Sequence, residues 1–320
     1  MTIAATAFTA ALIYTKSVLI PFTISLFLFA ILAPFFTFLQ RRAKVPRALA
    51  LVVTFLIFIG VTSLLSLLIV NSLGDFIEGA GVYRDRIVQV MEWGAALLSK
   101  YGVTLDTATL KKELMNLPIF TIVKNFTGGL FGIATNTFLV VIFTLFLLLG
   151  ERSKLKQDSI LIPIQQNISR YVATKVLTSL ATGLIVGVTL LILDVELALM
   201  FGLITILLNF IPSVGSIFAT ILPLPIILLQ FGLGFKFYLA IAIMGVVQII
   251  IGNIVEPKLM GEGLGLHPIT LLVFLIFWGL VWGIPGMFLA VPITSILKII
   301  LSKMENTKAL AELFAGNISI

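Results

Sequence analysis

The chain has 320 residues, of which 60% are hydrophobic and 11% are charged, and its mean hydropathy is +1.19. A soluble globular domain is about 45–50% apolar, so this composition excludes one and is typical of a polytopic membrane protein. The formal net charge of +7 fits basic cytoplasmic loops, and we expect no nucleic acid partner. The absence of cysteine excludes disulfides and thiolate metal ligands.

The apolar runs are long enough to cross a bilayer, whose hydrocarbon core of about 30 Å takes about 20 helical residues. The run LALVVTFLIFIGVTSLLSLLIV at 49–70 lacks the alternation of apolar and polar residues that a barrel strand requires. We therefore predict an all-α polytopic membrane protein with about eight transmembrane helices. A count of ten remains open.

The N-terminal region, 1–71, contains apolar segments at 2–15 and 17–39, a basic loop, and a further segment at 48–71. The first segment has no basic n-region and no cleavage site of a signal peptide, so we expect a retained helix. The loop QRRAKVPR at 40–47 has four basic residues and no acid. By the positive-inside rule, this loop and the N-terminus are cytoplasmic.

Residues 72–125 differ in composition, with six acids and six bases. Apolar residues recur there at spacings of three and four, which predicts an amphipathic helix. We expect a small helical extracytoplasmic insert. Packing against the membrane domain and gating of a substrate path are both compatible with this pattern.

A transmembrane helix at 126–150 returns the chain to a cytoplasmic amphipathic segment at 151–175. The C-terminal transport core covers 176–303, and a cytoplasmic tail covers 304–320. Two apolar segments of the core, 197–211 and 268–283, are about 15 residues long, or roughly 23 Å as helices. That is less than the bilayer thickness, so we expect broken or re-entrant segments in the C-terminal half.

Polar residues recur every four positions at 165–183, at Gln166, Arg170, Thr174, Thr178 and Thr182. This slanting stripe could line an inner vestibule, where Arg170 would attract anions or phosphate head groups. The alternative is an interfacial helix with its polar face in water.

The segment GNIVEPKLMGEGLGLHP at 252–268 is unusually polar for this chain. Glu256 is followed directly by Pro257, which removes a backbone hydrogen bond and frees a carbonyl near Asn253. A carboxylate beside free backbone at a helix break can bind a cation, a proton or a polar solute. The alternative is a wet surface loop, in which Glu256 pairs with Lys258. Further candidate site residues are Lys258, Glu262 and His267.

A second candidate segment is FIPSVGSIFATILPLP at 210–225, which follows the amide of Asn209. Pro212 can break a helix, Ser213 supplies a hydroxyl, and Gly215 allows close helix approach. We interpret this segment as a broken helix facing the substrate path or as a tightly packed kink.

Together these motifs resemble the autoinducer-2 exporter (AI-2E) family of permeases. The resemblance rests on the spacing P-x-x-G-x-x-x-A-x-x-x-P at 212–223, on GNIVEPKLMGEGLGLHP, on WGLVWGIPGMFLAVPI at 278–293, and on PRALA after the basic loop. It implies a multi-pass transporter of the bacterial inner membrane. Some members of this family are described as exporters of autoinducer-2, a quorum-sensing signal, and others as cation/proton antiporters.

Three functions follow as hypotheses. The first is export of a small polar solute, for which the resemblance suggests autoinducer-2. The second is sodium (or lithium)/proton antiport, with Glu256 binding the cation and the proton in turn, helped by Asn253 and by Asp194 or Glu196. The third is a non-transporting membrane scaffold. We expect no enzymatic activity, no cofactor and no bound metal, and as partners membrane lipids and further copies of the chain in a homo-oligomer.

Overall fold

The computed structural model describes residues 2–78, 138–150, 161–260 and 265–316, together with a few isolated positions between 86 and 99. Within these ranges the protein is helical and contains no strand. The α-helices are α1 (Thr2–Tyr14), α2 (Lys16–Arg41), α3 (Arg47–Glu78), the Phe138–Leu149 helix, α7 (Leu161–Ile192), α8 (Ala198–Leu208), α9 (Val214–Ile221), α10 (Leu224–Phe231), α11 (Phe235–Ile250), α12 (Glu256–Met260), α13 (Pro268–Trp282), α14 (Ile284–Lys303) and α15 (Lys308–Ala315). A π-helical turn, Ile251–Val255, joins α11 to α12, and a 3₁₀ turn, Glu305–Thr307, precedes α15.

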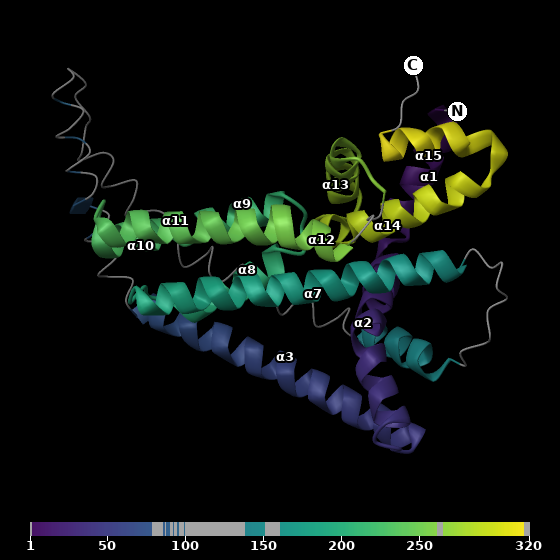
Figure 1. The fold of residues 1–320 in the computed structure, drawn as a ribbon, viewed down its shortest axis with the longest axis horizontal. Coiled ribbons are helices and arrows are strands. Elements are labelled where there is room, and N and C mark those ends of the chain that lie inside the picture. Colours follow the sequence, from purple (N-terminus) through teal and green to yellow (C-terminus); the bar gives the residue numbers. More distant parts are fainter. Residues whose placement is uncertain are drawn as a thin grey trace.

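The helices are arranged around α7, which runs across the centre of the molecule (Figure 1). α11 lies along α7, whereas α2 crosses it, and α7 contacts both. The α2–α3 corner, the first turns of α7 and the last turns of α14 all lie toward the right-hand end in Figure 1. The basic segments of the chain are thus gathered at one end of the fold.

Six helical segments of the described residues are long and apolar enough to cross a membrane. They are Lys16–Arg41, Arg47–Leu68, Gln166–Ile192, Val214–Phe231, Phe235–Met260 and Ile284–Lys303. Three shorter apolar helices accompany them: Phe138–Leu149, Ala198–Leu208 and Pro268–Trp282. The two short segments expected at 197–211 and 268–283 are therefore confirmed as short helices, while the total of eight spans stays a prediction.

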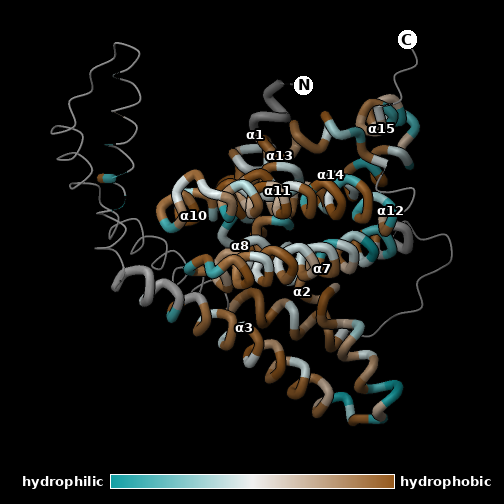
Figure 2. Tube along the Cα trace, turned by 60° about the vertical axis from the view of Figure 1, so that its left-hand side comes forward, coloured by the Kyte–Doolittle hydropathy of each residue, from teal (hydrophilic) through white to brown (hydrophobic). Residues whose placement is uncertain are grey.

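Polarity is inverted relative to a soluble protein, because large apolar side chains face outward and small polar ones face inward. Leu280 is 82% exposed and Phe146 is 71% exposed, whereas Thr182 and Ser179 are fully buried. Hydrophobic residues dominate much of the length of the long helices in Figure 2, as the mostly brown tube of α3 shows. This distribution suits a hydrocarbon solvent, in which interhelical contacts use small and hydroxyl-bearing residues.

The close packing of α7 on α8 depends on glycine. A Cβ atom on Gly183 of α7 would lie 2.6 Å from the carbonyl oxygen of Gly202 on α8, and one on Gly202 would lie 3.0 Å from the Cα atom of Gly187. Gly183 and Gly187 are four residues apart and present one face, so the two backbones touch. This contact holds the short helix α8 against the long helix α7.

Two helix boundaries differ from the sequence expectation. α3 continues to Glu78, seven residues beyond the expected end at 71. α7 begins at Leu161, and its candidate membrane span begins at Gln166 rather than at 176. The polar residues before 176 lowered the apparent hydropathy, but several of them face the protein interior. Most of the expected insert at 72–125, including its proposed amphipathic helix, lies outside the described residues.

Candidate functional site

The polar stripe on α7 is buried where it passes α8 and α12. Thr178 donates a hydrogen bond to the carbonyl of Thr174 at 2.9 Å, and Thr182 donates to the carbonyl of Thr178 at 2.8 Å. A threonine hydroxyl bonded to its own helix can be buried without a partner on another helix. Burial of Thr174, Thr178 and Thr182 excludes the interfacial alternative for this part of the stripe. Arg170, one turn earlier, is exposed.

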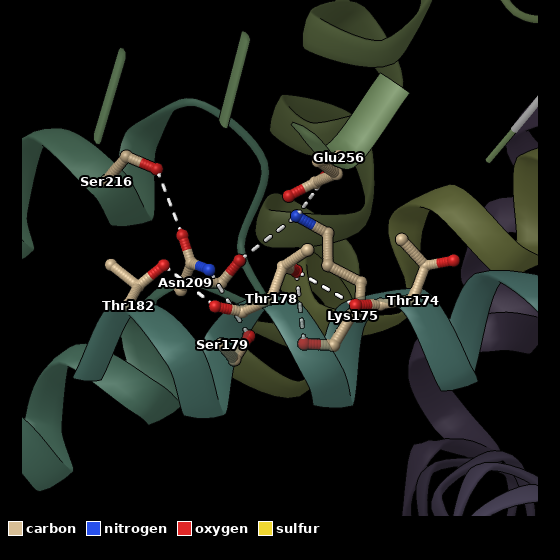
Figure 3. A network of polar contacts seen from close by, with 8 residues as sticks. All are labelled: Thr174, Lys175, Thr178, Ser179, Thr182, Asn209, Ser216 and Glu256. Atoms are coloured by element: carbon tan, nitrogen blue, oxygen red, sulfur yellow. Dashed lines mark hydrogen bonds and ion pairs between the residues drawn. The ribbon is translucent and has the colours of Figure 1, made fainter. Parts of the chain in front are cut away.

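A buried ion pair lies beside this stripe (Figure 3). The Nζ atom of Lys175 on α7 is 2.6 Å from Oε1 of Glu256, and the two side chains are 4% and 15% exposed. Lys175 lies nine residues inside its candidate span, a depth of about 14 Å along the helix. Ionisable residues at such depth are costly, and in membrane proteins they pair with one another and mark substrate or ion pathways.

Asn209, the residue that follows α8, connects three helices at this pair (Figure 3). Its carbonyl oxygen accepts a hydrogen bond from Lys175 Nζ at 3.1 Å. Its amide Nδ2 donates to Ser179 on α7, and its Oδ1 accepts from Ser216 on α9, both at 3.3 Å. Asn209 is 2% exposed. Both polar atoms of the Asn209 side chain are hydrogen-bonded, and its backbone carbonyl holds Lys175. The network therefore fixes α7, α8 and α9 around the ion pair.

The backbone around Glu256 is a π-helical turn rather than a helix break. The helix is continuous as a candidate span from Phe235 to Met260, and its π-helical turn at Ile251–Val255 ends directly before Glu256. Pro257 has no N–H and cannot donate to the carbonyl of Asn253, four residues earlier. A single π turn is a common way to absorb such a defect, and it is frequent at functional sites.

Glu256 does not pair as the sequence suggested. Lys258, the partner in the surface-loop alternative, is exposed, and Glu256 pairs with Lys175 instead. Asn253 is also exposed. Residue 257 is an exposed proline in α12, and Glu262 lies outside the described residues.

His267 is a structural residue in this fold. Its Nδ1 accepts a hydrogen bond from the N–H of Ile269 at 3.3 Å, which caps the start of α13. Its own backbone N–H donates to the carbonyl of Phe314 in α15 at 2.9 Å. The histidine thus joins the chain before α13 to the last helix instead of facing Glu256.

The candidate residues at 209–215 form the corner between α8 and α9. A Cβ atom on Gly215 would lie 1.7 Å from the carbonyl oxygen of Leu208, so any larger residue would force the corner apart. Ser213 is exposed and has a φ of 59°, a strained left-handed value for a non-glycine residue. Pro212 precedes it in the same corner. This tight turn brings Ser216 to Asn209, and hence α9 to the ion pair.

Comparison with known proteins places this architecture in one family. The profile of the AI-2E family transporter matches residues 2–306. The chain belongs to the AI-2E transporter family. It is 30% identical to the AI-2 transport protein TqsA of Escherichia coli, over 94% of this chain and 90% of the relative. It is 30% identical to a "Putative transport protein" of Haemophilus influenzae, over 91% and 88%, and 28% identical to a protein of the same name in Borreliella burgdorferi, over 94% and 86%.

This AI-2E family member is therefore a multi-pass membrane transporter. Two of its acids, Asp194 and Glu196, lie beyond the far end of α7, about 25 Å along the helix from Lys175. Asp194 pairs with Lys236 at 3.1 Å, and the N–H of Glu196 donates to Gln230. The expectation that either acid assists Glu256 is wrong for this structure.

The sequence patterns do not identify two residues of the site, Lys175 and Tyr171. Lys175 lies within the polar segment 165–183, but nothing in the sequence assigns it to Glu256, because residues on different helices carry no mutual spacing signal. Tyr171, one turn before Lys175, is 2% exposed, and its hydroxyl has no hydrogen-bond partner in the described part of the transporter. It lies four residues before Lys175, so the two side chains share one face of α7.

The site has groups that can bind a polar solute. Among the described residues, no group of three His, Cys, Asp or Glu side chains is placed to hold a metal ion. A lysine ammonium has three N–H donors, and the contacts to Glu256 and Asn209 use two. One donor of Lys175, the second carboxylate oxygen of Glu256 and the Tyr171 hydroxyl have no partner among the described residues and can serve a ligand.

Proposed function

We propose that this transporter exports a small polar solute, with autoinducer-2 as the candidate substrate, along a path that the Lys175–Glu256 pair closes. The observation that carries the proposal is the buried pair itself, formed between two candidate membrane spans. The choice of substrate is supported by the similarity to a protein named as an AI-2 transport protein. We place the protein in the bacterial inner membrane with both termini in the cytoplasm.

In this proposal the structure represents a closed state. A separation of 2.6 Å between Lys175 Nζ and Glu256 Oε1 leaves no room for a solute between the two charges. A solute that enters must separate them and replace their mutual contact with its own hydrogen bonds. Hydroxyl groups suit this exchange, because a hydroxyl donates to a carboxylate and accepts from an ammonium.

The geometry is less favourable for sodium/proton antiport. The carboxylate of Glu256 already has a fixed cation at contact distance, so sodium or lithium would have to displace the ammonium of Lys175. The desolvated ammonium would then remain close to the bound ion, which adds electrostatic repulsion. We therefore do not propose antiport, but the flux experiment is designed so that it would detect it.

Flux through proteoliposomes tests the proposal. Purified protein is reconstituted with autoinducer-2 inside and, in a second preparation, with a pH-sensitive dye and an imposed sodium gradient. Glu256→Gln is compared with Glu305→Gln, which removes an exposed carboxylate outside the site. We expect autoinducer-2 efflux in the wild type and in Glu305→Gln, and a loss of about tenfold or more in Glu256→Gln.

Three other results would contradict the proposal or a part of it. Sodium-dependent proton movement that is lost in Glu256→Gln would establish antiport instead. Absence of both fluxes in protein that is folded and reconstituted would favour the scaffold. Efflux that is equal in Glu256→Gln and Glu305→Gln would remove the ion pair from the path while leaving the transporter intact.

A further inference from the structure

A cavity of about 340 Å³ lies away from the ion pair, at the corner between α2 and α3. Its walls come from the last three turns of α2, the first residue of α3 and the end of the Phe138–Leu149 helix. The volume falls at the lower end of the range for small-molecule sites, about 300–1,000 Å³. It can therefore hold a molecule larger than a single ion.

One side of this cavity is apolar. Phe29, Ala33 and Phe36 line it from α2, and Leu148 lines it from the Phe138–Leu149 helix. Ala33, Phe36 and Leu148 are each less than 9% exposed and belong to one hydrophobic cluster. Such a floor binds hydrocarbon and disfavours a free, fully hydrated solute.

The opposite side is cationic. Arg41 and Arg47 line the cavity, and Arg42 and Lys44 lie in the same corner without an acid between residues 40 and 47. Neither ion pair found among the described residues includes any of these four. Within the ranges that the structure describes, no acidic side chain pairs with these four residues, so their charge is available to an anion there.

Arg47 gives this side a fixed geometry. Its Nη2 donates to the carbonyl oxygen of Leu149 and, at 3.4 Å, to that of Gly150. These carbonyls end the Phe138–Leu149 helix, and the guanidinium satisfies them. The arginine offsets the negative end of that helix and remains in the wall, where its other N–H groups can face a ligand.

We propose that this cavity binds an anionic phospholipid, with its phosphate at Arg41 and Arg47 and the first part of an acyl chain on the Phe29–Phe36 floor. An apolar floor beside two guanidinium groups that form no ion pair with the described residues matches an amphiphile with a phosphate head. Guanidinium groups bind phosphate in a bidentate manner. A free phosphate would use the rim alone and would leave the apolar half of the cavity unexplained.

The proposal is independent of the transported solute and is tested by lipid binding. Full-length protein in neutral detergent is titrated with phosphatidylglycerol or with phosphatidylcholine, and bound lipid is counted by native mass spectrometry. The informative pair of variants is Arg41→Gln and Arg42→Gln. Both remove one charge from the same corner, but only the first removes a residue of the cavity wall.

We expect phosphatidylglycerol to bind more tightly than phosphatidylcholine. Arg41→Gln should weaken phosphatidylglycerol binding about fivefold, the effect typical of one basic residue at an anionic lipid, and Arg42→Gln by less than about twofold. Ala33→Leu, which fills the apolar floor, should also weaken binding. A thermal melt of Ala33→Leu shows whether this variant has folded. If it has not, the comparison of Arg41→Gln with Arg42→Gln tests the proposal without it.

Three results would overturn the proposal. Equal losses in Arg41→Gln and Arg42→Gln would indicate attraction to diffuse surface charge. Equal binding of phosphatidylcholine would remove the role of the anionic head. Displacement of phosphatidylglycerol by millimolar inorganic phosphate would indicate a free-phosphate site instead of a lipid site.

Discussion

The Nζ atom of Lys175 lies 2.6 Å from Oε1 of Glu256, and this contact joins the central helix α7 to the end of the Phe235–Met260 span. The ammonium is also held by the carbonyl of Asn209. Both charges are shielded from bulk water, so each depends on the other to offset its desolvation. If the solute passes this pair, as we propose, then the same contact affects both the stability and the transport activity of this protein.

The first prediction concerns this coupling. Lys175→Met and Glu256→Met each leave one buried charge without its partner, and each should lower the free energy of unfolding by about 3–5 kcal/mol. The double variant should be far less destabilised than the sum of the two, because it buries no charge. Yet it should not transport, since it lacks both the donor and the acceptor. Thermal melts in detergent and flux in proteoliposomes measure the two effects.

The comparison of the two single variants with the double variant has a matched control and a result that would contradict it. Lys258→Met removes an exposed ammonium two residues from Glu256 and should change neither property by a measurable amount. Strict additivity of Lys175→Met and Glu256→Met would mean that the two side chains do not interact in the membrane-embedded protein.

Much of the fold could be predicted from the sequence, because a membrane span is a local property. Runs of about 20 apolar residues identify long helices, and the short segments at 197–211 and 268–283 were recognised by length alone. The start of α7 was missed for a physical reason. Thr174 and Lys175 lower the average hydropathy of their segment, but they face the protein interior and not the lipid.

The site was predicted less well than the fold. Glu256 is a candidate because a carboxylate beside a proline is unusual in an apolar run. Asn209 is a candidate because an amide is also unusual in such a run. Their partners lie on other helices, and no spacing within one helix reveals which face meets which. Asn253 and Lys258 were selected by proximity in sequence, and the π-helical turn leaves both exposed.

The second prediction compares two asparagines. Asn209→Leu removes the amide that bonds Ser179 and Ser216, and it should cost about 1–3 kcal/mol because a buried and a partly buried hydroxyl lose their partner. The backbone carbonyl that holds Lys175 remains, so transport should fall without being abolished. Asn253→Leu, at an exposed position, should leave stability and flux near the wild-type values. A larger loss of flux in Asn253→Leu would show that the π-helical turn, and not Asn209, faces the solute.

The third prediction tests the contact between α7 and α8. Gly183→Ala places a Cβ atom 2.6 Å from the carbonyl oxygen of Gly202, and a backbone atom cannot rotate away. The helices must separate, which we expect to cost about 1–3 kcal/mol. Gly245→Ala on α11 is the matched control, because nothing lies within 4 Å of its added methyl group. That change should be neutral or stabilise by up to about 1 kcal/mol. Equal melting temperatures for the two variants would contradict the backbone contact.

The fourth prediction concerns Tyr171, whose buried hydroxyl has no hydrogen-bond partner in the described part of the protein. Tyr171→Phe keeps the ring and removes the hydroxyl, so it breaks no hydrogen bond of the closed state. Stability should be unchanged or slightly higher, because an unsatisfied buried group is removed. If the hydroxyl bonds the solute, the apparent KM for efflux should rise by about two- to tenfold, the effect of one lost hydrogen bond.

Tyr238→Phe provides the control for this last change, because it removes the same hydroxyl from a side chain that is 57% exposed. It should alter neither melting temperature nor KM. A clear loss of stability in Tyr171→Phe would mean that the hydroxyl has a structural partner in the membrane. An unchanged KM with unchanged stability would place the solute elsewhere on the Lys175–Glu256 pair, at the Asn209 side, where the carbonyl already holds the ammonium.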